Sequence, residues 1–189
     1  IDILRQSMKR DTRPGVAIFF TGLSCSGKST LAQKLLARLQ ELQDREVTLL
    51  DGDVIRDHLS KGLGFSKEDR DENVRRVGFV ASEIVRHGGI VICSLIAPYN
   101  DARRGVRNRI EHYGEFVEVF VDTSLAECER RDTKGLYAKA RLGLIKGCTG
   151  IDDPYEVPQN PELIAKTEEA SPDELVSHIV DYLKTRGVL

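Results

Sequence analysis

The stretch GVAIFFTGLSCSGKSTLAQ, residues 15–33, joins an apolar run to a glycine-rich loop. Within it the pattern G-x-x-x-x-G-K-[ST] begins at Gly22 and ends at Ser29. The apolar run predicts a buried strand, and residues 29–42 carry leucines at helical spacing. A strand before this pattern and a helix after it are the setting in which such loops hold nucleotide phosphates. The stretch therefore predicts a site for the phosphates of ATP or GTP.

The loop offers phosphates three kinds of contact. Backbone N–H groups of residues 23–29 would point at the phosphates, helped by the N-terminus of the following helix. The Lys28 side chain would reach the β- and γ-phosphates, and the Ser29 hydroxyl would bind Mg²⁺. The predicted nucleotide-binding residues in this loop are Gly22, Leu23, Ser24, Cys25, Ser26, Gly27, Lys28, Ser29 and Thr30.

Length and composition narrow the class of protein. The chain has 189 residues, enough for one domain with a sizeable core. A net charge of −2 gives no reason to expect nucleic acid or an anionic membrane as the main partner. The longest apolar runs are too short to span a bilayer, and the polar first residues do not resemble a signal peptide. The four cysteines form no C-x-x-C pair, so we expect reduced, mostly buried thiols in a cytoplasmic protein.

Short apolar runs alternate with longer amphipathic segments along the chain. That alternation predicts an α/β fold with a largely parallel sheet. Strands are expected at 15–22, 46–53, 90–98 and 116–122, and helices at 29–42, 66–89, 101–112, from 124 onward and at 171–184. Ser66 can cap one of these helices, and Ser171 with Glu174 forms a capping box before another.

The phosphate loop alone leaves open a GTPase switch and a small-molecule kinase. A GTPase would need N-K-x-D and a D-x-x-G at a strand end, but the chain has no N-K-x-D and its DTKG (132–135) lies in a basic segment. A kinase needs a carboxylate near the acceptor hydroxyl. Asp51 and Asp53 lie where the second strand ends, and open parallel sheets bind ligands at the carboxyl ends of their strands. One aspartate could accept the acceptor's proton while the other helps to hold Mg²⁺ through water, which favours the kinase.

Cationic and aromatic residues follow the two aspartates. Arg56 is one helical turn from Asp53, while Arg70 and Asn73 are three residues apart and share a helix face. Phe65 precedes that pair. An aromatic ring beside guanidinium groups suits an acceptor that is a nucleotide with an anionic tail.

The segment 130–148 holds six basic residues and one acidic residue. We expect it to form a lid, about 130–155, whose basic side chains reach over the phosphates, with Arg131 on the ATP side. Closure would exclude water and limit wasteful ATP hydrolysis. Hinges are expected at the glycines of this region, Gly135, Gly143, Gly147 and Gly150.

Several segments together resemble the adenylylsulfate kinase (APS kinase) family, namely GLSCSGKST, LDGDVIRDHLSKGLGFSKEDRDENVRR, IAPY, FVEVFVDTSLAECERRDTKGLYAKAR and IKGCTGIDDPYE. The resemblance extends from about Gly15 to Pro161. It implies a three-layer α/β/α P-loop kinase domain at 15–189, after an N-terminal segment or linker at 1–14. It also implies that ATP phosphorylates the 3′-hydroxyl of adenosine 5′-phosphosulfate (APS), giving 3′-phosphoadenosine 5′-phosphosulfate (PAPS) for sulfate activation. The family requires Mg²⁺ and is usually dimeric, so a homodimer is expected.

The family's functional residues match positions of this chain. By analogy, Asp53 is the favoured general base, Asp51 lies close to the metal with Ser29, and Lys28 acts at the transferred phosphate. The implied acceptor-binding residues are Asp53, Arg56, Phe65, Arg70, Asn73, Ile96, Ala97, Lys134, Gly147 and Cys148, with Phe65 stacking on the adenine.

Three positions depart from the family pattern. The family resembles I-S-P-[YH], and its serine has been assigned as a phosphoenzyme intermediate; Ala97 stands there and cannot carry phosphate, so we expect direct, in-line transfer. Cys148 replaces a common Phe that forms the second wall of an adenine sandwich, a loss of about 1 kcal/mol or more of stacking. We therefore expect either weaker acceptor binding or a substitute apolar wall. Cys25 replaces a small Gly or Ala, which the loop should tolerate because it works through its backbone, although the thiol could make the site sensitive to oxidants.

APS kinases also occur fused to ATP sulfurylase, which makes APS. The start at Ile1 and the polar first residues are compatible with a kinase domain from such a fusion. The alternatives are another small-molecule P-loop kinase and a catalytically idle nucleotide-binding domain that regulates a fused sulfurylase. The presence of Lys28, Ser29, Asp53 and Arg56 argues against the idle domain.

Overall fold

A five-stranded parallel sheet forms the centre of the molecule. The computed structural model describes residues 13–42 and 44–189, so most of the expected segment 1–14 lies outside the described residues. The strand order is β2-β3-β1-β4-β5, and every neighbouring pair is parallel, which confirms the predicted α/β class. The strands are β1 Val16–Thr21, β2 Val47–Asp51, β3 Ile90–Ser94, β4 Glu115–Asp122 and β5 Leu163–Lys166.

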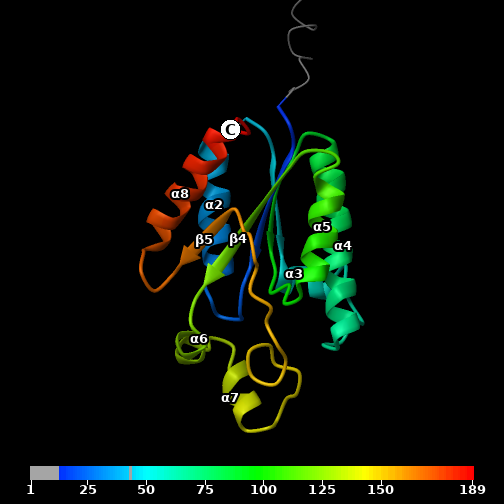
Figure 1. Cartoon of the computed structure of the whole chain (residues 1–189), viewed down its shortest axis with the longest axis vertical. Coiled ribbons are helices and arrows are strands. Elements are labelled where there is room, and N and C mark those ends of the chain that lie inside the picture. Colours follow the sequence, from blue (N-terminus) through cyan, green and yellow to red (C-terminus); the bar gives the residue numbers. More distant parts are fainter. Residues whose placement is uncertain (1–12, 43) are drawn as a thin grey trace, which may run out of the picture.

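Two layers of helices cover the sheet. Helices α2 (Lys28–Leu42) and α8 (Pro172–Thr185) pack on one face, and α4 (Lys67–Arg86) and α5 (Asn100–Ile110) pack on the other (Figure 1). Successive residues of a strand point to opposite faces, so the fully buried β1 serves both layers. Ile18 belongs to the core beneath α2 and α8, while Phe19 belongs to the core beneath α4 and α5.

Three short helices complete the fold of the described residues: α3 Gly52–Asp57, α6 Leu125–Arg131 and α7 Leu136–Arg141. Helices α6 and α7 lie beyond the end of the β4 arrow, at the opposite end of the molecule from the C-terminus (Figure 1). They are therefore at the carboxyl edge of the sheet, where the sequence predicts the ligand site. No helix among residues 13–42 and 44–189 is long and apolar enough to cross a membrane.

The helix caps follow the predicted signals. The Ser66 hydroxyl accepts the Asp69 N–H at the start of α4, and Ser171 and Glu174 form a complete capping box at α8. Two expected strands end at least two residues earlier than predicted. The strand expected at 46–53 ends at Asp51, because the Asp51 carboxylate accepts the Asp53 N–H at 3.0 Å and starts α3. The strand expected at 90–98 ends at Ser94, and residues 95–98 continue as a loop.

Candidate active site

A cavity of about 950 Å³ opens at the carboxyl edge of the sheet. The phosphate loop, α3, the start of α4 and the loop after β3 contribute to its walls. The predicted site residues that line it are Ser24, Cys25, Gly27, Lys28, Ser29, Thr30, Asp51, Asp53, Arg56, Phe65, Arg70, Asn73, Ile96, Ala97, Arg131 and Lys134. The geometry thus brings together the donor-side and acceptor-side residues that the sequence named.

Five predicted residues lie outside this lining: Gly22, Leu23, Ser26, Gly147 and Cys148. Gly22 packs against β4, because a Cβ at this position would come within 2.7 Å of the Val121 carbonyl oxygen. Ser26 is fully buried. Gly147 remains next to the site, because its carbonyl oxygen accepts a hydrogen bond from Arg70.

Lys28 is buried at the base of the phosphate loop. Its ammonium group donates to the Leu23 carbonyl oxygen and, at 3.4 Å, to the Ser26 hydroxyl. Burial lowers the pKa of Lys28 to about 8, because the charged ammonium loses hydration. The side chain is therefore positively charged at neutral pH and is held where a phosphate group would take over its contacts.

The two aspartates have different partners. Asp51 is both the last residue of β2 and the cap of α3, and its carboxylate accepts a 2.8 Å hydrogen bond from the Ser29 hydroxyl. Asp53 is in the first turn of α3, where its exposed carboxylate forms an ion pair with Lys134. Lys134 follows α6, so this ion pair joins the lid segment to the opposite wall of the cavity.

The acceptor side has an aromatic ring flanked by two guanidinium groups. The Phe65 side chain is 64% exposed, and the centre of its ring is 4.7 Å from Arg56 and 5.7 Å from Arg70. Arg56 donates to the Gly64 carbonyl oxygen at 2.7 Å. Burial, followed by the nearby charge of Arg70, lowers the pKa of Arg56. Such an exposed ring beside positive charge provides a surface for a planar base that carries an anionic group.

Two buried polar atoms of the cavity wall have no hydrogen-bond partner among the described residues. They are the side-chain oxygen of Asn73 and the hydroxyl of Ser94. Both residues are more than nine-tenths buried. These two atoms could therefore form hydrogen bonds with a polar molecule bound in the cavity.

Hydrogen bonds from two side chains fix the backbone of the loop after β3. The Thr21 hydroxyl donates to the Ile96 carbonyl oxygen at 2.7 Å, and the buried Arg103 donates to the Ala97 carbonyl oxygen. Ala97 has a φ of +44°, which is unusual for a residue with a side chain. Arg103 could not be predicted from the sequence, because an arginine on a charge-rich helix resembles a solvated residue until the fold buries it.

The lid segment contains the end of α6 and all of α7. The four glycines expected as hinges all have positive φ angles, so each occupies a conformation that glycine adopts readily. Thr133 and Thr167 also line the cavity but were not predicted. Thr167 follows β5, a strand that was not predicted from the sequence. The position of Thr167 at the carboxyl edge of the sheet could therefore not be predicted either.

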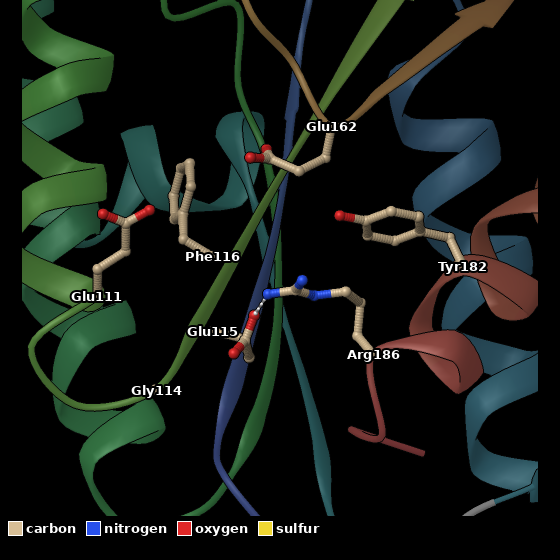
Figure 2. Close-up of a pocket in the computed structure, with 7 residues that line it drawn as sticks. All are labelled: Glu111, Gly114, Glu115, Phe116, Glu162, Tyr182 and Arg186. Carbon is tan, nitrogen blue, oxygen red and sulfur yellow. Dashed lines mark hydrogen bonds and ion pairs between the residues drawn. The ribbon is translucent and has the colours of Figure 1, made fainter.

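A second cavity, of about 350 Å³, lies near the amino end of β4 and the end of α8. It is lined by Glu111, Gly114, Glu115, Phe116, Glu162, Tyr182 and Arg186, and an ion pair of 2.8 Å joins Arg186 to Glu115 (Figure 2). None of the predicted site residues lines this cavity. We therefore assign the chemistry to the larger cavity, where the phosphate loop and the carboxylates meet.

Comparison with known proteins agrees with this geometry. Residues 14–166 match the family model described as adenylylsulphate kinase. An adenylyl-sulfate kinase of Synechococcus sp. strain JA-2-3B'a(2-13) is 54% identical over 176 residues, covering 93% of this chain and 98% of that protein. A sulfate adenylyltransferase of Chaetomium globosum is 44% identical over all 189 residues, which correspond to 33% of its length.

A solved structure is also similar. The APS kinase of Mycobacterium tuberculosis, in complex with AMPPNP and APS, is 43% identical and superposes with a TM-score of 0.85. The match covers 91% of this chain and 99% of that one.

Proposed function

This chain belongs to the adenylylsulfate kinase family and is an ATP-dependent kinase that converts APS to PAPS in sulfate activation, and we propose that it transfers the phosphoryl group directly, with Asp53 as the general base. The observation that carries the proposal is the 950 Å³ cavity, which is lined by the phosphate loop and also by Asp53 and Phe65. A donor and an acceptor nucleotide could therefore meet within one cavity.

The donor ATP occupies the phosphate loop in this proposal. Lys28 would exchange its contact with the Leu23 carbonyl oxygen for the β- and γ-phosphates. The Ser29 hydroxyl and the Asp51 carboxylate, 2.8 Å apart, are hard oxygen donors of the kind that Mg²⁺ prefers. Two such groups suffice because Mg²⁺ keeps several waters and binds the phosphates as well. When bound, Mg²⁺ would offset the negative charge of the phosphates.

The acceptor APS lies against the opposite wall. Its adenine would stack on the exposed Phe65 ring, while Arg56 and Arg70 face the anionic end. The unpaired oxygen of Asn73 would accept a hydrogen bond from the acceptor. The backbone of Ile96 and Ala97 and the neighbouring Gly147-Cys148 pair would complete the acceptor pocket.

The transfer needs one base and no covalent intermediate. Asp53 would leave its ion pair with Lys134 and accept the proton of the 3′-hydroxyl as that oxygen attacks the γ-phosphorus. The new bond joins the 3′-oxygen to phosphorus, and the bond between phosphorus and the β–γ bridging oxygen breaks to release ADP. Lys134 and Arg131 would then offset charge that develops on the phosphoryl group. Ala97 has no atom that could hold phosphate, which supports a single displacement.

We also propose a cytoplasmic homodimer that works beside, or fused to, the sulfurylase that supplies APS. The full-length match to one third of a sulfate adenylyltransferase supports the link to that enzyme. The thiols of Cys93 and Cys128 are buried and unpaired, which suits a reducing compartment. The homodimer rests on the family resemblance. Light scattering of the purified chain tests it, and a monomer at working concentrations would contradict it.

The experiment that tests the proposed function measures ATP-dependent PAPS formation by the purified protein and by Asp53→Asn. We expect turnover in the parent and a loss of roughly 10²–10⁴-fold in kcat in the variant, with ADP binding unchanged. Asp101→Asn is the matched control, because Asp101 is exposed and forms a surface ion pair with Arg104 on α5. Turnover by Asp53→Asn close to that of the control would contradict the role of Asp53.

A further inference from the structure

One buried side chain of the lid segment has no part in the proposed reaction. Tyr137, on α7, is 1% exposed, and its hydroxyl donates a 3.0 Å hydrogen bond to the carbonyl oxygen of Ser24. Burial raises the pKa of this hydroxyl, so it stays a neutral hydrogen-bond donor at physiological pH. Because Ser24 belongs to the phosphate loop, the bond joins the lid segment to the backbone that would hold ATP.

The orientation of one peptide group depends on this bond. In a trans peptide the carbonyl of one residue and the N–H of the next point in opposite directions, and no described peptide bond is cis. Tyr137 is buried and does not line the cavity, so its hydroxyl draws the Ser24 carbonyl oxygen away from the cavity. The N–H of Cys25 is therefore turned the other way, toward the cavity that Ser24 and Cys25 line.

The backbone of Cys25 has an unfavourable conformation. Its φ is +58°, in the left-handed region that residues with a side chain rarely adopt. Such a conformation persists only where surrounding contacts impose it. Among the described residues, Tyr137 is the one donor to the Ser24 carbonyl, whereas the Ser26 carbonyl has two, Thr123 and Arg131.

Tyr137 is itself fixed at the start of α7. The Asp132 carboxylate accepts hydrogen bonds from the backbone N–H groups of Tyr137, at 3.2 Å, and Ala138, at 2.9 Å. These two bonds cap the first turn of the helix. The hydroxyl thus reaches the loop from a rigid base, although it belongs to the segment expected to act as a lid.

We propose that Tyr137 is a positioning residue for the donor nucleotide, whose hydroxyl holds the Ser24–Cys25 peptide so that the Cys25 N–H faces a phosphate of ATP. This inference rests on the proposed nucleotide site. It gives the lid segment a second role, in which Tyr137 on α7 holds the Ser24–Cys25 peptide of the phosphate loop in place before the lid closes. Displacement of α7 would release the peptide, so lid movement and donor affinity are coupled.

Calorimetric titration with MgADP tests the proposal in the parent, in Tyr137→Phe and in Tyr182→Phe. Tyr137→Phe keeps the ring but removes the hydroxyl, and we expect its Kd for MgADP to rise roughly three- to tenfold, the worth of one hydrogen bond. The KM for ATP should rise in parallel while the KM for APS stays unchanged. Tyr182 lies in the distant second cavity, so its variant should bind MgADP as the parent does.

A rescue separates loop positioning from simple packing. Glycine adopts a positive φ without strain, so adding Cys25→Gly to Tyr137→Phe should return the Kd for MgADP to within about twofold of the parent. An unchanged Kd in Tyr137→Phe, or no rescue by glycine, would overturn the proposal. If Tyr137→Phe fails to fold, Asp132→Ala replaces it, since it loosens α7 and keeps the ring; an unchanged Kd there would overturn the proposal equally.

The variant Lys28→Ala distinguishes a failure of the proposed nucleotide site from a failure of the proposed role of Tyr137. If the parent does not bind MgADP, the proposed nucleotide site fails, and this inference fails with it. If the parent binds MgADP, Lys28→Ala does not, and Tyr137→Phe binds as tightly as the parent, only the role of Tyr137 fails.

Discussion

Lys28 gives nucleotide binding a dependence on pH. Its pKa is lowered to about 8 by burial, so the ammonium is charged below pH 8 and loses its proton as the pH rises above it. Bound phosphates would favour the charged form, so binding above pH 8 must also take up a proton. We expect the affinity for MgADP to be constant from pH 6.5 to 7.5 (roughly the range below this pKa) and to fall by up to about tenfold per pH unit above pH 8.

Titration calorimetry at several pH values measures this dependence. Lys28→Arg is the control, because a guanidinium group stays charged over the whole range and should remove the decline, even if its affinity is lower. An affinity of the parent that does not change up to pH 9.5 would show that Lys28 has an ordinary pKa or does not meet the phosphates.

Cys148 offers a test of the acceptor pocket. Arg70 connects the two walls, since it lies 5.7 Å from the centre of the Phe65 ring and donates to the carbonyl oxygen of Gly147, next to Cys148. A Phe at position 148 would supply the second aromatic wall that the family commonly has. We expect Cys148→Phe to lower the KM for APS about fivefold, as about 1 kcal/mol of stacking predicts, and to leave the KM for ATP unchanged.

Steady-state kinetics with APS as the varied substrate checks this expectation. Cys148→Ser has almost the same size as the parent side chain and should keep the parent's KM. A KM for APS in Cys148→Phe that equals that of Cys148→Ser would mean that position 148 does not face the adenine.

The sequence could predict single residues where a motif assigns them a role. Lys28, Asp53 and Phe65 could be predicted because each belongs to a motif with a known chemical role, and all three line the cavity. Tyr137 and Arg103 could not be predicted in this way. Tyr137 donates to the carbonyl oxygen of Ser24, more than 100 residues away in the sequence, and Arg103 donates to that of Ala97 in the neighbouring loop. These hydrogen bonds are known only once the fold is known.

At the scale of elements, the capping serines of α4 and α8 form a natural pair of tests. Ser66 accepts the Asp69 N–H at 3.1 Å, and Ser171 accepts the Glu174 N–H at 3.4 Å. We expect Ser66→Ala and Ser171→Ala each to lower the free energy of unfolding by about 1 kcal/mol, measured by urea denaturation. Only Ser66→Ala should also raise the KM for APS, because the first turn of α4 adjoins Phe65 and carries Arg70.

Each of these two variants therefore serves as the experimental control for the other. Equal losses of stability with a change of KM in Ser66→Ala alone would support a direct link between this helix start and the acceptor pocket. The same KM for APS in both variants would contradict that link.

The elements that were missed are short. Strand β5 has four residues, too few for an alternating pattern to stand out, and it is defined by its pairing with β4. Helix α3 has six residues and exists because Asp51 caps it immediately after a strand. By contrast, α4 and α8 were predicted well because long amphipathic patterns and serine caps agree.

At the scale of the whole molecule, a buried ion-pair network ties a helix layer to the sheet. Glu118 on β4 lies 3.0 Å from Arg103 and 3.4 Å from Arg107, both on α5. Glu118 and Arg103 are each more than 90% buried. We expect Glu118→Ala to destabilise the protein by about 3 kcal/mol or more in thermal or urea unfolding, because it strands a buried guanidinium charge.

Glu111 is the matched control for that network. It pairs with the same Arg107, at 3.2 Å, but on the surface, so Glu111→Ala should cost about 1 kcal/mol or less. A similar, small loss of stability in both variants would show that the buried pair contributes no more than a surface one.

The global architecture was predictable only in part. Alternating strands and helices indicate a parallel sheet, but they do not give the order β2-β3-β1-β4-β5. That order sets β1 between β3 and β4, so the phosphate loop after β1 adjoins both the loop after β3 and the helices after β4. The meeting of acceptor pocket, phosphate loop and lid is therefore a property of the topology rather than of any one motif.

The proposed reaction is a single, direct phosphoryl transfer from ATP to the 3′-hydroxyl of APS. It can be tested with ATP whose γ-phosphoryl group is made chiral with oxygen isotopes, followed by determination of the configuration of the group in the product PAPS. One in-line displacement inverts the configuration at phosphorus, so we expect inversion. Retention would require two displacements through a phosphorylated enzyme, and that result would contradict direct transfer in a protein with alanine at position 97.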